Sequence, residues 1–234
     1  MRRISDPSIV GREYATTERL AARRLDRTAW LRGEEPWRVA LQAIAEIHPK
    51  RVLDAGCGNG DFAALIAAPE VMCVDVSEGA VAKAREHGLR AEVADIERLP
   101  FADGSLDVVT CNWVLYHLTD LDAGLAEIVR LLRPSRRFVG IYNHPDHLAE
   151  LWRLVTDSVW DEDFFGCKSG PAVLRRHFRH VECRDAVGKA MWATKEAAQA
   201  FLDAFAELAG PLTAPEGPYP LEASRRNCVL VADV

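Results

Sequence analysis

The chain has 234 residues, a formal net charge of −6 at pH 7 and a hydrophobic fraction of 49%. This length fits one α/β domain with additions, and the hydrophobic fraction is that of a globular protein with a buried core. The mildly acidic balance argues against a general nucleic-acid-binding protein, so no nucleic-acid partner is expected.

Six cysteines are scattered along the chain, and none is paired at C-x-x-C spacing. We therefore expect neither a zinc site nor a redox dithiol. Cys73, Cys111 and Cys228 lie in apolar, strand-like runs, where a free cysteine acts as a small hydrophobic residue. This usage predicts a reducing, cytoplasmic location. The charged N-terminus and the absence of a long apolar run predict neither a signal peptide nor a membrane span.

Residues 1–33 are expected to form a helical cap that precedes the main domain at residues 34–234. Residues 18–30 show amphipathic helical spacing, with arginines between the apolar positions. Two large aromatic residues belong to this element, Tyr14 and Trp30. They are expected either to fasten the cap to the core or to line a pocket.

The most informative stretch of the chain follows a predicted helix over residues 35–47. Residues 52–60 read Val-Leu-Asp-Ala-Gly-Cys-Gly-Asn-Gly, a short apolar run, an acid and three alternate glycines. The pattern predicts a buried strand, a tight turn and a helix over 61–67. Alternate glycines permit positive φ angles and let a ligand approach the backbone. Such a turn, at the carboxyl end of a central strand, is the usual ligand crevice of an open α/β sheet.

The spacing of acids and glycines distinguishes between ligands. The dinucleotide fingerprint G-x-G-x-x-G has its third glycine where this chain has Asp61, because Gly60 comes one residue early. Carboxylates at Asp54 and Asp61 would repel a pyrophosphate and suit a ligand with a cationic end. A purely structural turn in another α/β protein is the alternative interpretation.

Two further acids follow the next two predicted strands. The second strand ends at Asp75, about 20 residues beyond the glycines, the spacing at which an acid binds ribose hydroxyls. The alternative is a solvated strand end. Ser77 is expected to cap a helix that ends at residue 87. A third strand over 90–93 leads to Asp95.

A fourth strand is predicted over residues 106–111, and catalytic side chains of α/β proteins commonly follow such a strand. His117 is the candidate general base, because an ordinary histidine pKa near 6.5 suits proton removal at neutral pH. The alternative is a histidine that only braces the loop. Trp113 and Tyr116 are expected either to pack or to contact a ligand.

The second half of the chain begins with a periodic helix over 120–132 and a fifth strand over 137–142. A helical segment over 144–160 follows, and residues 144–170 are expected to form a substrate lid. The residues expected to bind the substrate are Tyr116, His144, Trp160, Phe164 and Phe165. The remaining predicted elements are a helix over 170–178, a strand over 180–187, a helix over 194–208, a loop over 210–222 and an antiparallel last strand over 228–232.

Three motifs resemble those of class I S-adenosylmethionine (SAM)-dependent methyltransferases. They are Asp-Ala-Gly-Cys-Gly-Asn-Gly at 54–60, Leu-Pro-Phe-Ala-Asp-Gly-Ser-Leu-Asp at 99–107 and Glu-Ile-Val-Arg-Leu-Leu-Arg-Pro at 127–134. The chain resembles the broad type 11 group, which includes the ubiquinone- and menaquinone-biosynthesis type, over about residues 51–142. Ser-Arg replaces the usual Gly-Gly at 135–136. The resemblance implies a Rossmann-like, seven-stranded, mostly parallel sheet with one antiparallel strand and helices on both faces.

The resemblance also implies SAM as the cofactor and S-adenosylhomocysteine as the product. It assigns the glycines to the methionine end of SAM, Asp75 to the ribose, and Asp95 with the backbone of Ile96 to the adenine. A looser resemblance to actinobacterial methyltransferases of specialised metabolism places Tyr14 over the cofactor. The full set of expected cofactor-binding residues is Asp54, Gly56, Cys57, Gly58, Gly60, Asp75, Val76, Asp95, Ile96, Asn112, Trp113 and Tyr14.

Three functions fit the sequence. The first is a small-molecule methyltransferase, in which an acceptor oxygen, nitrogen or carbon displaces the sulfonium in line. The second is an RNA or protein methyltransferase, which would need a basic face, and arginines concentrate only near the N-terminus. The third is a SAM-binding scaffold or regulator without turnover. No metal-ligand cluster is visible, so no metal is expected, and the oligomeric state stays open between monomer and homodimer.

Overall fold

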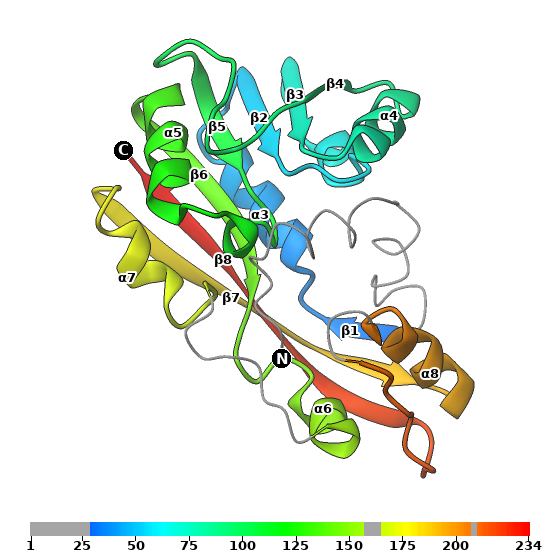
Figure 1. Cartoon of the computed structure of the whole chain (residues 1–234). Coiled ribbons are helices and arrows are strands. Elements are labelled where there is room, and N and C mark those ends of the chain that lie inside the picture. Colours follow the sequence, from blue (N-terminus) through cyan, green and yellow to red (C-terminus); the bar gives the residue numbers. More distant parts are fainter. Residues whose placement is uncertain (1–28, 157–164, 207–209) are drawn as a thin grey trace.

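The computed structural model describes residues 29–156, 165–206 and 210–234. They form one mixed sheet with helices on both faces (Figure 1). The strands are β1 (Trp30–Gly33), β2 (Arg51–Ala55), β3 (Glu70–Asp75), β4 (Arg90–Val93), β5 (Leu106–Thr110), β6 (Leu132–Asn143), β7 (His180–Trp192) and β8 (Leu221–Asp233). The helices are α3 (Pro36–Ala45), η2 (Ala63–Leu65), α4 (Glu78–Glu86), η3 (Leu115–His117), α5 (Leu121–Leu131), α6 (Ala149–Val155), α7 (Gly170–Leu174) and α8 (Lys195–Asp203).

The sheet has eight strands among the described residues, in the order β1-β7-β8-β6-β5-β2-β3-β4. Strands β4, β3, β2, β5 and β6 are parallel, whereas β8 is antiparallel to both β6 and β7. This confirms the Rossmann-like class and the antiparallel last strand. Because the carboxyl ends of the parallel strands share one edge, the turns that follow β2, β3, β4 and β5 lie together.

The sheet has one strand more than the seven expected. Trp30 was predicted at the end of a helix, but it begins β1, which pairs antiparallel with the far end of β7. Gly33 of β1 lies close against Gly188 of β7: a Cβ on Gly33 would come within 2.6 Å of the Gly188 Cα. Two glycines at one register position therefore let the extra strand dock. The rest of the expected N-terminal cap, residues 1–28, lies outside the described residues.

Successive side chains of each strand point to opposite faces of the sheet, so a hydrophobic layer lies on each face. One set of side chains packs with α5 and α7, and the opposite set packs with α3 or α4. Leu53 and Val109 face α5, whereas their neighbours Val52 and Val108 face α3. Both faces of the central strands β2, β3 and β5 are thus buried, as their near-continuous apolar runs require.

Several predicted elements have different lengths in the structure. The helix expected over 61–67 is only the short η2, because Pro69 follows closely and residue 70 already pairs in β3. The helices expected over 144–160 and 194–208 are described only as α6 and α8. Strands β7 and β8 are longer than predicted, 13 residues each, because they pair with each other along their whole length. In Figure 1 they extend past the parallel strands toward α6 and α8.

The prediction that Cys228 is a free cysteine is wrong. Cys228 of β8 forms a disulfide with Cys167, a residue 61 positions earlier in the chain. The other four cysteines are free. The inference of a reducing compartment from unpaired cysteines therefore loses part of its basis. Within the described ranges, no helix is long and apolar enough to cross a membrane.

Asp107 anchors the amino end of β5, away from the edge where ligands bind. Its side chain is 1% exposed and accepts hydrogen bonds from the backbone N–H groups of Lys50 (2.8 Å) and Arg51 (3.0 Å). It also pairs with Arg133 at 2.7 Å and Arg136 at 3.3 Å. Burial alone would raise the pKa of Asp107, but these donors outweigh it and hold the pKa below its ordinary value.

The variant Asp107→Asn is expected to lower the free energy of unfolding by about 2–3 kcal/mol at neutral pH, because charged hydrogen bonds are lost. The folded-state pKa is depressed, so the contribution is complete above the unfolded pKa near 3.9 and disappears as the pH falls through the folded pKa. Urea unfolding at neutral and acidic pH measures this. Equal midpoints for both proteins at neutral pH would contradict the anchoring role.

Candidate SAM-binding and methyl-transfer site

The glycine turn after β2 has the predicted conformation. Gly56, Gly58 and Gly60 have φ angles of 75°, 53° and 80°. The N–H groups of Gly56 and Cys57 both donate to the carbonyl oxygen of Val74 in β3, at 2.8 and 3.0 Å. The turn is thus held against the neighbouring strand with its glycines in the left-handed region that other residues avoid. One buried atom of the turn, the Oδ1 of Asn59, accepts no hydrogen bond from the described residues.

Asp75, at the end of β3, fastens this turn to α4. Its Oδ2 accepts from the Gly58 N–H and its Oδ1 from the Ser77 N–H, each at 2.9 Å. Ser77 caps α4 as predicted, because its hydroxyl accepts from the N–H of Ala80 at 3.2 Å. A carboxylate has about four lone-pair positions, so each Asp75 oxygen retains accepting capacity. Burial raises the pKa of Asp75 despite these hydrogen bonds.

Asp54 is a buried acid directly before the turn. It is 2% exposed, and the hydroxyl of Thr110 in β5 donates to its Oδ1 at 3.3 Å. The described residues form no ion pair with it. Burial raises the pKa of Asp54 to about 7, the Thr110 hydrogen bond lowers it, and the nearby Asp75 raises it further. A cationic group bound beside this carboxyl would stabilise its charged form.

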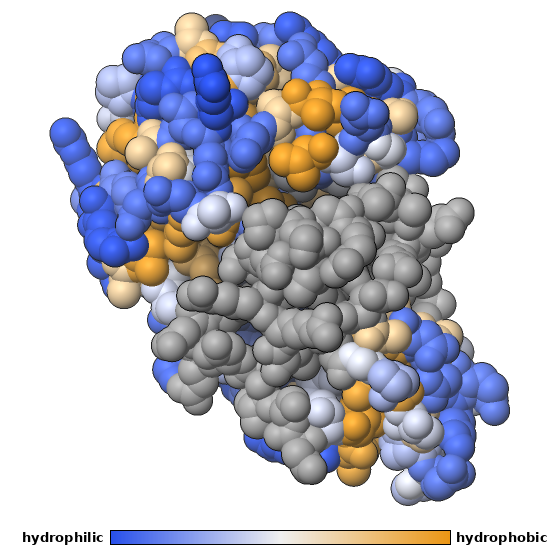
Figure 2. All heavy atoms as spheres, in the orientation of Figure 1, coloured by the Kyte–Doolittle hydropathy of each residue, from blue (hydrophilic) through white to orange (hydrophobic). Residues whose placement is uncertain are grey.

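The residues after β4 lie next to this edge. The N–H of Ala94 donates to the carbonyl oxygen of Asp75 at 3.1 Å, which brings the two strand ends together. Asp95 is exposed, and its Oδ1 accepts from the Glu97 N–H at 2.9 Å. The Ile96 side chain is buried in the core, whereas Val76, after Asp75, is 58% exposed. Hydrophobic surface is visible over the part of the molecule that carries β3, β4 and α4 (Figure 2).

Asn112 and Trp113, expected at the cofactor, are held by protein contacts. The Asn112 amide donates to Thr110 at 3.0 Å and accepts from the Ile141 N–H at 3.1 Å, so it bridges β5 and β6. Trp113 has a φ of 56°, and its indole N–H donates to Asn143 at 2.8 Å. A tryptophan in the left-handed region is uncommon and is found where the surroundings enforce it.

Aromatic rings connect η3 to the segment before α7. The Tyr116 ring lies 4.4 Å from the His117 ring and 6.4 Å from that of Tyr142, and Tyr142 contacts Phe165 at 4.8 Å between centroids. The Tyr142 hydroxyl donates to the carbonyl oxygen of Cys111 at 2.7 Å. His117 and Tyr116 are thus brought together, whereas Phe165, expected to bind substrate, is 5% exposed and packs in the core.

A cluster of polar side chains follows β6, of which only His144 is predicted from the sequence as part of a site. His144 forms a hydrogen bond through Nδ1 with Asp146, and the other Asp146 oxygen accepts from Arg226 of β8. Burial lowers the pKa of the adjacent His147 to about 4. Arg226 lies 80 residues from Asp146, so local sequence could not pair them. The available signal was His-Pro-Asp directly after a strand.

Three expected site residues lie outside the described residues: Tyr14, Trp160 and Phe164. In the parts of the chain that the structure describes, no group of three His, Cys, Asp or Glu side chains could hold a metal ion.

Solved structures of other proteins share this fold. A SAM-dependent methyltransferase from Thermotoga maritima, described as a possible histamine N-methyltransferase, superposes with a TM-score of 0.56 at 19% identity, covering 84% of this chain and 88% of that one. The [4+2]-cyclase SpnF superposes with a TM-score of 0.52 at 17% identity, covering 84% and 80%. At these identities the likeness shows the fold alone.

Comparison with protein families finds a model that matches part of the sequence. Residues 53–140 match the family described as "Methyltransferase domain". With the fold, the match makes residues 53–140 similar to class I SAM-dependent methyltransferases, a class whose cofactor is SAM.

Two curated relatives have different acceptors in their names. Demethylmenaquinone methyltransferase of Deinococcus radiodurans is 38% identical over 67% of this chain and 62% of its own length. Malonyl-[acyl-carrier protein] O-methyltransferase of a Methylovorus species is 34% identical over 46% of this chain and 42% of its own. The chain thus spans less than two thirds of either relative.

Proposed function

We propose that this protein transfers the methyl group of SAM to a small-molecule acceptor by in-line displacement. The observation that carries the proposal is the pair of carboxyl groups beside the glycine turn: Asp54, buried without a cation among the described residues, and Asp75, tied to the turn itself. SAM has no phosphate and carries an ammonium and a sulfonium, so it suits a site that would repel a dinucleotide. Small-molecule acceptors in the relatives' names support the second half of the proposal.

The residues present fit this cofactor. Positive φ angles at Gly56 and Gly58 let the methionine part approach the backbone, and the unpaired Oδ1 of Asn59 offers an acceptor in the same turn. The remaining lone pairs of Asp75 would accept from ribose hydroxyls. Asp95 with the Ile96 backbone would bind the adenine edge, and exposed Val76 would cover its face.

SAM supplies an activated methyl group on a good leaving group, so the chain has mainly to position the acceptor and exclude water. Orientation of this kind contributes up to roughly 7–11 kcal/mol in well-aligned systems. His117 would remove the acceptor proton where the acceptor has one to lose, with its ring oriented by Tyr116. The identity of the acceptor determines whether the methyl group is transferred to oxygen, nitrogen or carbon.

Transfer of a tritiated methyl group from SAM, assayed with demethylmenaquinol and a panel of phenols, amines and carboxylic acids, tests the proposed function. Labelled product and stoichiometric S-adenosylhomocysteine are expected with at least one small molecule. SAM binding without transfer to any of them, but with transfer to RNA or protein, would overturn the small-molecule assignment.

The variant His117→Ala is expected to lower kcat by about 10²–10⁴-fold for an acceptor that must be deprotonated, because general-base catalysis is lost. SAM affinity should stay within about twofold, because His117 lies in η3 and outside the glycine turn. His117→Gln is the control for ring packing against Tyr116. Full turnover in both variants would remove His117 from catalysis.

The raised pKa of Asp54 leads us to expect that SAM binding depends on pH. In the free protein its pKa is about 7, so it is largely protonated below that pH. A bound cation favours the carboxylate, so binding releases a proton and becomes tighter as the pH rises from about 6 to about 8, by at most about tenfold per unit. Calorimetry in two buffers of different ionisation enthalpy counts the proton. Asp54→Asn should abolish its release, and pH-independent proton-free binding by the wild type would contradict the cation site.

A further inference from the structure

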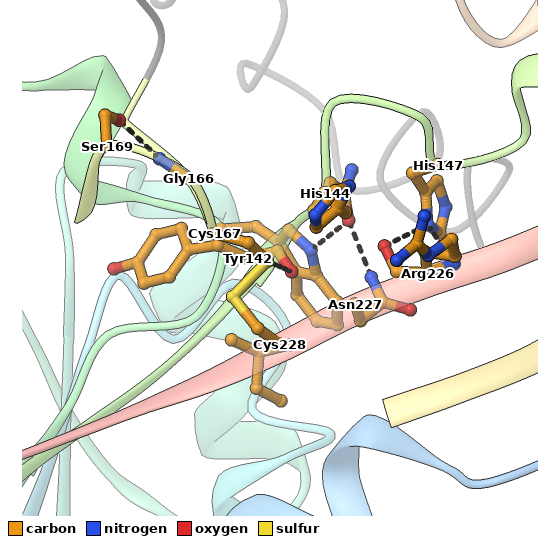
Figure 3. The surroundings of a disulfide bond; sticks show 12 residues. Tyr142, His144, His147, Gly166, Cys167, Ser169, Arg226, Asn227 and Cys228 are labelled. Carbon is orange, nitrogen blue, oxygen red and sulfur yellow. Dashed lines mark hydrogen bonds between the residues drawn. A yellow bond between two sulfur atoms is a disulfide. The ribbon is translucent and has the colours of Figure 1, made fainter. Parts of the chain in front are cut away.

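The disulfide joins two parts of the fold that are distant in sequence. Cys228 lies in β8, fully buried, at the register position of Tyr142 in β6. Cys167 lies between Phe165 and α7, and it is 8% exposed. Figure 3 shows the bond beside Tyr142, with the segment around Gly166 and Ser169 on one side. The disulfide therefore fastens the segment that leads into α7 to the centre of the antiparallel part of the sheet.

This segment contacts the acceptor side of the proposed site through aromatic rings. Phe165, two residues before Cys167, packs edge-on against Tyr142 at 4.8 Å, and Tyr142 contacts Tyr116 at 6.4 Å. Tyr116 in turn lies against His117 at 4.4 Å. Because a close-packed interior transmits displacements between touching side chains, a shift of Phe165 is expected to move Tyr142 and, through it, Tyr116, the ring beside the candidate base.

Both redox states of the pair have suitable surroundings. The Cys167 sulfur lies 3.3 Å from the carbonyl oxygen of Tyr142, which a thiol at that place could use as a hydrogen-bond acceptor. Cys228 lies in an apolar cluster, where a free cysteine packs as a small hydrophobic residue. After reduction, the Cys167 thiol would thus have a hydrogen-bond acceptor and the Cys228 thiol would have apolar neighbours.

The other cysteines favour a reversible pair over a permanent one. Cys57, Cys73 and Cys111 are buried thiols, and Cys183 is an exposed thiol. A protein that keeps four free thiols beside a single disulfide has the pattern of a redox-responsive chain rather than that of a disulfide framework.

We propose that Cys167 and Cys228 form a reversible thiol–disulfide pair, and that its oxidised state locks Phe165 against Tyr142 and so fixes the acceptor wall of the site. The redox step itself is independent of the proposed function. Only the consequence for the acceptor wall rests on that function.

The exchange balances with a dithiol as reductant. A thiolate of the dithiol attacks the Sγ of Cys167, the less buried sulfur, so the Cys167–Cys228 bond breaks and Cys228 leaves and takes up a proton. The second thiol of the reagent then attacks the mixed disulfide and releases Cys167 as a thiol. The dithiol is oxidised to a disulfide by two electrons, and an external disulfide reverses the sequence.

Thiol counting tests the pair on the folded full chain. The protein is equilibrated with oxidised glutathione or with dithiothreitol, quenched with acid, unfolded, alkylated and weighed by mass spectrometry. Four alkylated cysteines are expected after oxidation and six after native-state reduction, in agreement with four free cysteines and one disulfide. Six thiols in both states would overturn the pair, and a bond that resists reduction until the protein unfolds would overturn its reversibility.

Hydrogen exchange tests the lock. Reduction of the wild type is expected to speed amide exchange in residues 165–174 by about tenfold, because the covalent restraint on local opening is removed. SAM affinity should change by less than about twofold, because the residues proposed to bind SAM lie in β2, at the end of β3 and in the turns that follow β2, β3 and β4. Unchanged exchange in this segment would overturn the lock even where the thiol count succeeds.

Matched variants separate the pair from general effects of reductant. Cys167→Ser should exchange like the reduced wild type and should not respond to dithiothreitol. Cys183→Ser, which changes the exposed free thiol, should respond as the wild type does. A response of Cys167→Ser equal to that of the wild type would assign the effect to another cysteine. Because thiol counting and hydrogen exchange need neither SAM nor acceptor, their results are independent of methyl transfer.

Discussion

Replacing Asp75 with alanine is expected to raise the Kd for SAM at least about tenfold, since charged hydrogen bonds are worth about 1.5–3 kcal/mol. The Asp75 carboxylate accepts hydrogen bonds from the N–H groups of Gly58 and Ser77, and it would also accept from the ribose hydroxyls. Isothermal titration calorimetry measures the change.

Ser77→Ala is the matched control for the Asp75 variant. It removes the hydroxyl that caps α4, at a cost of about 1 kcal/mol in stability, and leaves the carboxylate in place. SAM affinity should therefore fall much less than in Asp75→Ala. Equal affinities for the wild type and Asp75→Ala would remove Asp75 from the cofactor site.

Substituting Gly56 by alanine should damage both stability and SAM binding. Its φ of 75° is costly for any residue with a side chain, and an added Cβ would lie 2.5 Å from Cγ2 of Val114. We expect a loss of about 1–3 kcal/mol in unfolding free energy. SAM affinity should fall more than about tenfold, because the turn would have to move from β3. Thermal unfolding and calorimetry report the two effects separately.

Two further variants divide the Gly56 effect into its causes. Gly88 has a φ of 80° with no atom within 4 Å of an added Cβ, so Gly88→Ala measures the conformational cost alone. Adding Val114→Ala to Gly56→Ala removes the clash but not the strained φ, so it should recover part of the loss. A Gly56→Ala protein that binds SAM normally would show that the turn does not hold the cofactor.

The parallel half of the sheet could be predicted because its signals are local. Strands β2, β3 and β5 are short, mostly apolar runs, two of which end at or next to an acid, and glycine spacing marked the turn. The predicted cap Ser77 is confirmed for the same reason, because its hydroxyl accepts from the N–H three residues on. Thr194 caps α8 in the same way.

The antiparallel half depends on contacts that local sequence does not encode. Strand β1 is four residues long and pairs with β7, which lies far along the chain. The Cys167–Cys228 bond spans 61 residues, and connectivity of cysteines cannot be deduced from sequence alone. Arg226 meets Asp146 only because β8 returns beside β6.

Within the site, spacing located the acids but not their environments. Asp54 and Asp75 follow from the strand-ending pattern, whereas the burial that raises the pKa of Asp54 to about 7 comes from packing on both faces of the sheet. Phe165 was expected in a substrate lid, but it packs against Tyr142, near the disulfide that joins its segment to β8.

Calorimetric titration of the purified protein with SAM, S-adenosylhomocysteine and NAD in parallel distinguishes a SAM site from a dinucleotide site at the glycine turn. We expect binding of SAM and S-adenosylhomocysteine and none of NAD, because Asp54 directly precedes the glycine turn and Asp61 replaces the third glycine of the dinucleotide fingerprint. Binding of NAD alone would contradict the assignment of the turn to a cationic, phosphate-free cofactor.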